Sequence, residues 1–117
     1  MAPDPMNKTD FMNQVHDTLQ GLAEMLENQL DEHNDIDIRE GFLQITFPSG
    51  HTWLLNRHGP TQEIWLSSPI TGGLHFRFHE DIQRWISTRS SQDELFSFLE
   101  RELSAFSNSA ITIRLTS

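Results

Sequence analysis

Apolar residues recur every three or four positions over the first third of the chain. Between residues 7 and 33 they form a single stripe, which consists of Phe11, Val15, Leu19, Leu22, Leu26 and Leu30. This period places them on one face of a helix, where they would pack against a core. Asn7, with Asp10 three residues later, is a suitable N-terminal cap. The pattern predicts one long amphipathic helix from Asn7 to His33.

Strict alternation replaces the helical period between residues 35 and 88. Six short stretches alternate apolar and polar residues: 35–38, 42–47, 51–57, 63–67, 74–79 and 84–88. Turn-forming residues separate them, among them Gly41, Gly59 and Pro60. Such short links join antiparallel neighbours, because parallel strands need longer crossovers. We therefore expect an antiparallel meander of about five to six strands.

A second helix follows the meander. Ser91 and Glu94 have the spacing of a capping box, and an apolar stripe comes after them: Leu95, Phe98, Leu99, Leu103 and Phe106. Beyond it, Ile111, Ile113 and Leu115 predict a final extended segment. The order helix, sheet, helix predicts an α+β fold, a two-layer α/β sandwich with two terminal helices packed on one face of an antiparallel sheet.

One face of this sheet would remain without a helix, and Trp65 lies on it. Side chains alternate between the faces of a strand, so Glu63 and Trp65 point away from their apolar neighbours. Two helices cover only one face of the meander. We therefore expect Trp65 to be substantially exposed and flanked by Asn56 and Gln62.

Length and composition favour one domain. The chain has 117 residues, of which 36% are hydrophobic, enough for a single modest core. We predict a single domain over residues 8–117 and a flexible N-terminal lead-in over residues 1–7. The chain contains no cysteine, which excludes disulfides, thiolate metal sites and a cysteine nucleophile. No apolar run approaches the ~20 residues that a membrane-spanning helix needs, so we expect no membrane association.

The net charge of −9 is concentrated near the N-terminus. Residues 1–40 hold ten acidic residues against Lys8 and Arg39, whereas residues 41–117 hold seven against six arginines. Such a field repels nucleic acid and anionic membranes, and it favours cations or a basic protein surface.

Six acidic residues follow the end of the predicted first helix into the first strand: Glu24, Glu27, Asp31, Glu32, Asp35 and Asp37. They can form an ordinary solvated face or a cation-binding surface. Acids four residues apart repel one another, and acids at a helix C-terminus oppose its dipole, so stability alone does not favour this pattern. Open carboxylates suit hard, oxygen-seeking cations such as iron, at weak and multiple sites. His33 lies beside these acids and is a further candidate ligand.

The sequence offers little for catalysis. The six histidines lack the H-E-x-x-H spacing of zinc hydrolases, and Ser67 lacks the glycine-flanked elbow of a nucleophilic serine. We predict no catalytic residue.

The stretch from Asn56 to Pro69, read as N-R-H-G-P-T-Q-E-I-W-L-S-S-P, resembles the signature of the frataxin family. The resemblance extends to the acidic first helix, to D-I-D-I at 35–38, to L-Q-I-T-F at 43–47 and to W-I-S at 85–87, and covers roughly residues 8–106. His58 departs from the family pattern, which has glutamine there.

The resemblance implies a function in iron–sulfur cluster assembly and iron homeostasis. Frataxins bind iron and regulate the complex of cysteine desulfurase and iron–sulfur scaffold protein. The six acids would match the ridge that binds Fe2+ or Fe3+ weakly and meets the desulfurase. Trp65, Asn56, Gln62 and Arg57 would form the sheet patch that engages the scaffold.

Three hypotheses follow. The first is an iron-binding regulator or iron donor, a monomer located in the cytoplasm, or in the mitochondrial matrix if it is a processed eukaryotic form. The second is an acidic protein-binding adaptor with incidental metal binding. The third is a ferroxidase, which would need inward-facing ligands, whereas the sequence offers outward-facing ones.

Overall fold

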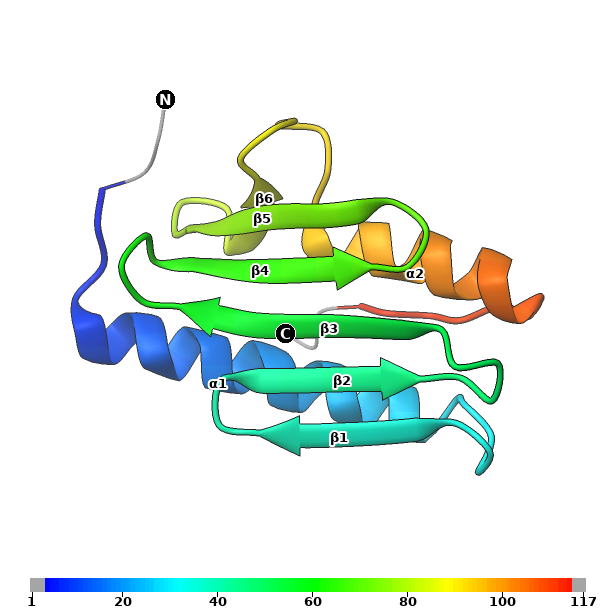
Figure 1. The fold of residues 1–117 in the computed structure, drawn as a ribbon. Helices are drawn as coiled ribbons and strands as arrows, with labels where there is room; N and C mark the ends of the chain where they lie inside the picture. The colour runs from blue at the N-terminus through cyan, green and yellow to red at the C-terminus, as the bar shows by residue number, and fades with distance from the viewer. Residues whose placement is uncertain (1–3, 115–117) are drawn as a thin grey trace.

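The computed structural model describes residues 4–114 as two helices packed on one six-stranded sheet (Figure 1). The helices are α1 (Lys8–Glu27) and α2 (Leu95–Ser107), and the strands are β1 (Asp35–Arg39), β2 (Phe42–Thr46), β3 (Thr52–His58), β4 (Glu63–Ser68), β5 (Gly72–His79) and β6 (Arg84–Ser87). The strands lie in chain order and every neighbouring pair is antiparallel. Both helices lie behind the sheet in Figure 1, which confirms the predicted two-layer α+β fold.

The helix α1 begins as the sequence predicts. The side chain of Asn7 accepts hydrogen bonds from the backbone N–H groups of Thr9 at 2.8 Å and Asp10 at 3.3 Å. These two donors have no partner inside the helix, because the first turn of a helix leaves its N–H groups free.

The predicted extension of this helix to His33 is wrong. The helix ends at Glu27, and Asn28 is its C-cap. The Asp31 carboxylate accepts a hydrogen bond from the backbone N–H of His33 at 2.7 Å, a local turn that competes with helix formation. Leu30 still packs against the core after the helix has ended, which explains why the apolar stripe continues.

The predicted cap of the second helix is also wrong. Glu94, not Ser91, is the N-cap of α2, and its carboxylate accepts from the N–H groups of Phe96 at 2.8 Å and Ser97 at 3.2 Å. A helix cannot begin at Ser91, because the chain pairs with β6 as far as Glu94. A carboxylate at this end also suits the helix dipole.

The core lies between the helices and the sheet. The apolar stripe of each helix meets the inward residues of the strands, and the best-buried side chains include Val15, Leu22, Leu43, Leu55, Ile64, Phe76, Leu99 and Leu103. In residues 4–114, no helix has the length and apolar character needed to cross a membrane.

Two indole N–H groups connect the layers. Trp53 of β3 donates to Glu102 of α2 at 2.9 Å, and Trp85 of β6 donates to Thr18 of α1 at 2.9 Å. Each helix is therefore attached to the sheet by a directional bond as well as by apolar packing.

The residues after α2 form no sheet strand as far as residue 114, although the sequence predicts an extended segment there. Ile111 and Ile113 are buried, and the amide of Gln29 both donates to and accepts from the backbone of Thr112 at 2.6 and 2.7 Å. Leu115, the last residue of the predicted segment, lies outside the described residues.

Candidate functional site

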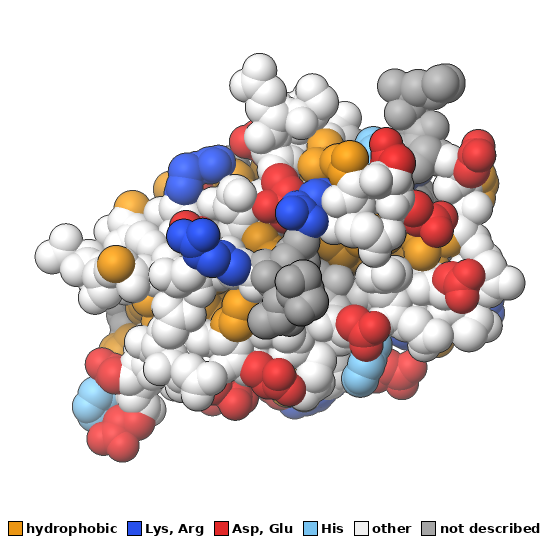
Figure 2. All heavy atoms as spheres, turned by 180° about the vertical axis from the view of Figure 1, so that it is seen from behind, with side chains coloured by type: hydrophobic (Ala, Val, Ile, Leu, Met, Phe, Trp, Pro, Cys, Tyr) orange, Lys and Arg blue, Asp and Glu red, His pale blue; other side chains and the backbone are white. Residues whose placement is uncertain are grey.

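The six candidate acids follow one edge of the molecule, which we call the acidic ridge, and all of them are exposed except Asp37, which is half-buried. Glu24 and Glu27 lie on the last turns of α1, Asp31 and Glu32 lie in the following loop, and Asp35 and Asp37 lie on β1. The last turn of α1 contains no basic residue. Viewed from the helix side, acidic side chains gather along the edge formed by α1 and the loop into β1 (Figure 2).

The acidic ridge is open rather than enclosed. Within residues 4–114, no three histidine, aspartate or glutamate side chains converge to hold an ion. Asp37 forms an ion pair with Arg39 at 3.1 Å, and Asp31 is held by the loop backbone. The exposed His33 contributes its backbone N–H to that loop. The ridge can therefore offer single carboxylates to weakly bound cations, but not a preformed cage.

A second feature lies on the sheet face that carries no helix. The indole of Trp65 is stacked between two imidazoles, with His58 at 3.8 Å and an interplanar angle of 14° on one side. On the other side His75 lies at 4.4 Å and 7°. Antiparallel pairing places Trp65 directly opposite His75 of β5. We call His58, Glu63, Trp65 and His75 the Trp65 platform.

Glu63 is the polar centre of this platform. Its side chain is only 9% exposed, although it lies on the face without a helix. One oxygen, Oε1, accepts hydrogen bonds from the Trp65 Nε1 and the Thr61 hydroxyl, both at 2.9 Å, and lies 3.5 Å from Nδ1 of His75. The other oxygen lies 3.7 Å from the Arg77 guanidinium. These contacts fix the direction in which the indole points.

The structure corrects the expected exposure of Trp65. No helix covers the indole, as predicted, but its two imidazole neighbours make it half-buried. Because both ring faces are occupied, the indole presents mainly its outer edge to an approaching molecule.

The four predicted partner-binding residues do not form one patch. Asn56 is exposed and pairs with Trp65 across β3 and β4. Gln62, expected to flank Trp65, instead bonds to the backbone of Met6 through both ends of its amide, at 2.7 Å each. Arg57 points to the opposite face, because its cross-strand partner is the core residue Ile64.

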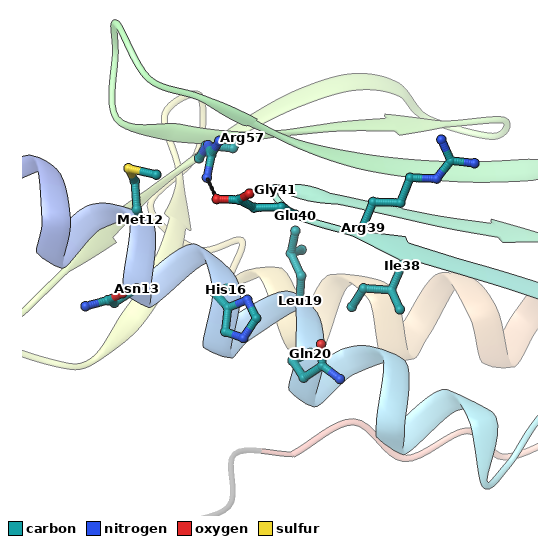
Figure 3. Close-up of a pocket in the computed structure, with 10 residues that line it drawn as sticks. All are labelled: Met12, Asn13, His16, Leu19, Gln20, Ile38, Arg39, Glu40, Gly41 and Arg57. Carbon is teal, nitrogen blue, oxygen red and sulfur yellow. Dashed lines mark ion pairs between the residues drawn. The ribbon is translucent and has the colours of Figure 1, made fainter.

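Arg57 lines a cavity of about 490 Å³ between α1 and the turn from β1 to β2 (Figure 3). Its guanidinium lies 3.7 Å from Glu40, and His16 and Gln20 reach the same space from α1. Gly41 is needed at this turn: its φ is +69°, and an added Cβ would lie 3.1 Å from the Arg57 side chain. The cavity is separate from both the acidic ridge and the Trp65 platform.

Sequence reasoning gave no site role to three members of the platform, His58, Glu63 and His75. The alternation in 63–67 places Glu63 on the same face as Trp65, which is a usable signal. The position of His75 depends on the register of β4 and β5, which no local pattern specifies.

These features make the chain a small α+β protein in which an acidic helix–strand edge borders an antiparallel sheet whose open face carries a half-buried tryptophan. Residues 4–109 match the family model described as a frataxin-like domain. The chain belongs to the frataxin family.

Known relatives agree with this assignment. A protein of Neisseria meningitidis, named iron-sulfur cluster assembly protein CyaY, is 37% identical over 97 residues, which are 80% of this chain and 87% of that protein. A Ralstonia pickettii protein of the same name is 30% identical over 112 residues, 93% of this chain and 96% of that protein. The solved frataxin of Psychromonas ingrahamii has a TM-score of 0.82 at 24% identity, covers 94% of this chain and all of the solved chain, and supports the fold.

Proposed function

We propose that this chain is an iron-binding regulator or iron donor in iron–sulfur cluster assembly, and that it acts on the complex of cysteine desulfurase and scaffold protein. The observation that carries the proposal is the acidic ridge, where carboxylates from α1, the following loop and β1 stand open to solvent. The name of the two relatives, iron-sulfur cluster assembly protein CyaY, supports a role in iron–sulfur cluster assembly. A solved yeast frataxin of the same fold is described as complexed with ferrous iron.

The mechanism has two parts that act through the same charges. Carboxylates of the acidic ridge bind Fe2+ or Fe3+ singly, with water completing the coordination, at weak sites that other divalent cations can also occupy. The same negative field attracts a basic surface of the desulfurase and orients the chain on it. The Trp65 platform, with Asn56 beside it, then meets the scaffold on the open sheet face. We assign no catalytic residue to this chain.

An anaerobic Fe2+ titration followed by NMR tests the metal part. We expect paramagnetic broadening to concentrate on residues 24–37. Broadening elsewhere, with that region unchanged, would exclude the acidic ridge as the iron site.

Charge reversal tests the docking part. Glu27→Lys should weaken binding to the desulfurase, and the loss should shrink as salt rises, because exposed charges are screened within about 8 Å at physiological ionic strength. Asp17→Lys is the matched control: it makes the same change in net charge on an exposed position of α1 outside the ridge. Equal losses in the two variants would mean that net charge, and not the ridge, drives docking.

The alternative function is an acidic protein-binding adaptor with incidental metal binding. The lack of a converged ligand group in residues 4–114 favours it. Cluster assembly with purified desulfurase and scaffold, with and without iron, distinguishes the two. An effect that is unchanged under strictly iron-free conditions supports the adaptor.

We further propose a monomer in the cytoplasm, or in the mitochondrial matrix for a processed eukaryotic form. A solved yeast frataxin is described as trimeric, so the state of association should be measured. Analytical ultracentrifugation with and without Fe2+ should give a single monomeric species if the proposal holds, whereas a trimer would contradict it.

A further inference from the structure

The Thr61 hydroxyl determines which nitrogen of His58 carries a proton. A threonine hydroxyl has one proton to donate, and here it donates it to Oε1 of Glu63 at 2.9 Å. Nδ1 of His58 lies 2.8 Å from the same hydroxyl oxygen. With its proton committed to the carboxylate, the hydroxyl can only accept from this nitrogen. Neutral His58 therefore carries its proton on Nδ1, and Nε2 keeps a free lone pair.

Glu63 acts on His75 from the other side of Trp65 through its charge rather than through a hydrogen bond. Nδ1 of His75 lies 3.5 Å from Oε1 of Glu63, and an ionised carboxylate only accepts. The proton of neutral His75 is thus favoured on Nδ1 as well. Its Nε2 lies on the far edge of a ring whose side chain is 46% exposed. One buried carboxylate therefore acts on two imidazoles, on His58 through the Thr61 hydroxyl and on His75 through its charge.

His58, whose Nδ1 is hydrogen-bonded to a carboxylate through the Thr61 hydroxyl, has the arrangement that metal-ligating histidines use, and His75 has the same carboxylate at ion-pair distance. The anchored N–H fixes the ring and makes the other nitrogen more basic. First-row transition-metal ions such as Ni2+ and Zn2+ bind well to imidazole nitrogen.

The two rings cannot share an ion. They lie on opposite faces of the indole, at 3.8 and 4.4 Å from it in a nearly parallel stack. Two nitrogens that share an ion would each lie about 2.0–2.1 Å from it, and therefore about 4 Å or less apart. Each ring must bind an ion of its own, in keeping with the lack of any three-ligand group in the described part of the chain.

We infer that His58 and His75 form a pair of single-imidazole sites for first-row transition-metal ions, one on each side of Trp65. Each supplies Nε2 as the one protein ligand, and water completes the coordination. These sites are nitrogen-based and lie on β3 and β5, so they do not depend on the carboxylates of the acidic ridge, although they share the Trp65 platform with the proposed scaffold contact.

Histidine ¹⁵N chemical shifts test the tautomers. We expect neutral His58 and His75 to carry the proton on Nδ1, whereas free imidazoles favour Nε2. His51 is the internal control: its Nδ1 also contacts a hydroxyl, that of Ser49 at 2.8 Å, but no carboxylate holds that hydroxyl's proton. Protons on Nε2 of His58 and His75 would overturn the inference.

Ni2+, added to the full chain, tests metal binding. Broadening should reach His58, His75 and the Trp65 indole N–H before it reaches His16, His33, His51 and His79. Equal broadening of all six histidines would overturn the proposed sites but leave the iron-binding proposal intact. Broadening confined to residues 24–37 would overturn them also.

Substitution of Thr61 links the two measurements. Thr61→Val removes the hydroxyl, so the His58 proton should move to Nε2. The Ni2+ affinity at His58 should then fall about tenfold, because the loss of a group that hydrogen-bonds a metal-ligating histidine lowers metal affinity by at least about this factor. Thr61→Ser keeps the hydroxyl and should restore both. An unchanged Ni2+ affinity at His58 in Thr61→Val would show that the anchoring has no effect.

Discussion

The indole N–H of Trp65 donates to Oε1 of Glu63 at 2.9 Å, a bond between two residues on the same face of β4. The indoles of Trp53 and Trp85 donate instead to the helices, at Glu102 and Thr18. Two of the three tryptophans thus join the layers of the fold. The third is held within its own strand, on the face that remains free for a partner.

Replacing Glu63 tests whether this bond holds the platform together. Glu63→Ala leaves the Trp65 N–H, His75 and Arg77 without their shared acceptor. We expect the free energy of unfolding to fall by about 1–3 kcal/mol, the cost of leaving such groups unpaired. Urea unfolding measures this loss, and the NMR resonance of the Trp65 indole N–H should move toward its solvent-exposed position.

Glu63→Gln is the matched control, because its amide oxygen still accepts from the indole although the charge is lost. It should keep the indole resonance nearer the native position and lose less stability. Identical losses in the alanine and glutamine variants would mean that charge alone, and not the hydrogen bond, holds the platform.

Glu102 should be a major contributor to stability. Its carboxylate accepts from the Trp53 indole at 2.9 Å, from the Ser68 hydroxyl at 2.7 Å and from the Thr71 hydroxyl. Glu102→Ala removes all three bonds and leaves the Trp53 N–H beneath α2. We expect the free energy of unfolding to fall by about 2–3 kcal/mol, which is the contribution of a hydrogen bond to a charged group when water cannot replace the lost acceptor. Glu80→Ala, at an exposed position, should change stability by less than about 0.5 kcal/mol in the same urea assay.

Period and alternation were sufficient to predict the architecture. The stripe through Val15 and Leu22 is buried on α1, and the alternation around Trp65 correctly kept that residue off the helix-covered face. These patterns are local, and they predict which side chains are buried; the structure buries those side chains. Leu30 shows the limit, because a residue can stay in the apolar stripe after the helix has ended.

The composition of the platform could not be predicted in the same way. His58 and His75 meet Trp65 from β3 and β5, so their contact depends on the register of three strands. The turns set that register, and a shift by one residue would place both imidazoles on the other face. Asn56 and Arg57 are adjacent in one strand and therefore face opposite sides, so alternation alone argues against a single patch that contains both.

Thr18 is the corresponding anchor of the other helix. It is buried on α1, and its hydroxyl accepts from the Trp85 indole at 2.9 Å. Thr18→Val keeps the shape but removes the acceptor, so a buried N–H loses its partner at a cost of about 1–3 kcal/mol. Thr18→Ser keeps the hydroxyl and should preserve the Trp85 indole resonance. If valine also preserves that resonance, another acceptor replaces Thr18 and the predicted cost is wrong.

The turn between β3 and β4 holds the N-terminal segment through Gln62. The amide of Gln62 bonds to both the N–H and the C=O of Met6, at 2.7 Å each, and the residue has a left-handed φ of +55°. Gln62→Ala removes the two bonds, so the Met6 amide should exchange with solvent much faster in hydrogen-exchange NMR. Gln62→Gly also releases Met6 but accepts the left-handed backbone, so it should be more stable than the alanine variant by about 1 kcal/mol.

Gln83 separates these two effects, because its φ is also +55° but its side chain bonds to the carbonyl of Glu80 and not to the N-terminal segment. Gln83→Gly should leave Met6 exchange at the native rate. Slow Met6 exchange in both Gln62 variants would show that the side-chain amide does not hold the segment. In that case the Gln62 side chain would be free to contact a partner, as the resemblance to the family signature implies. If Gln62 does hold Met6, a partner would have to displace the N-terminal segment before it could reach this amide.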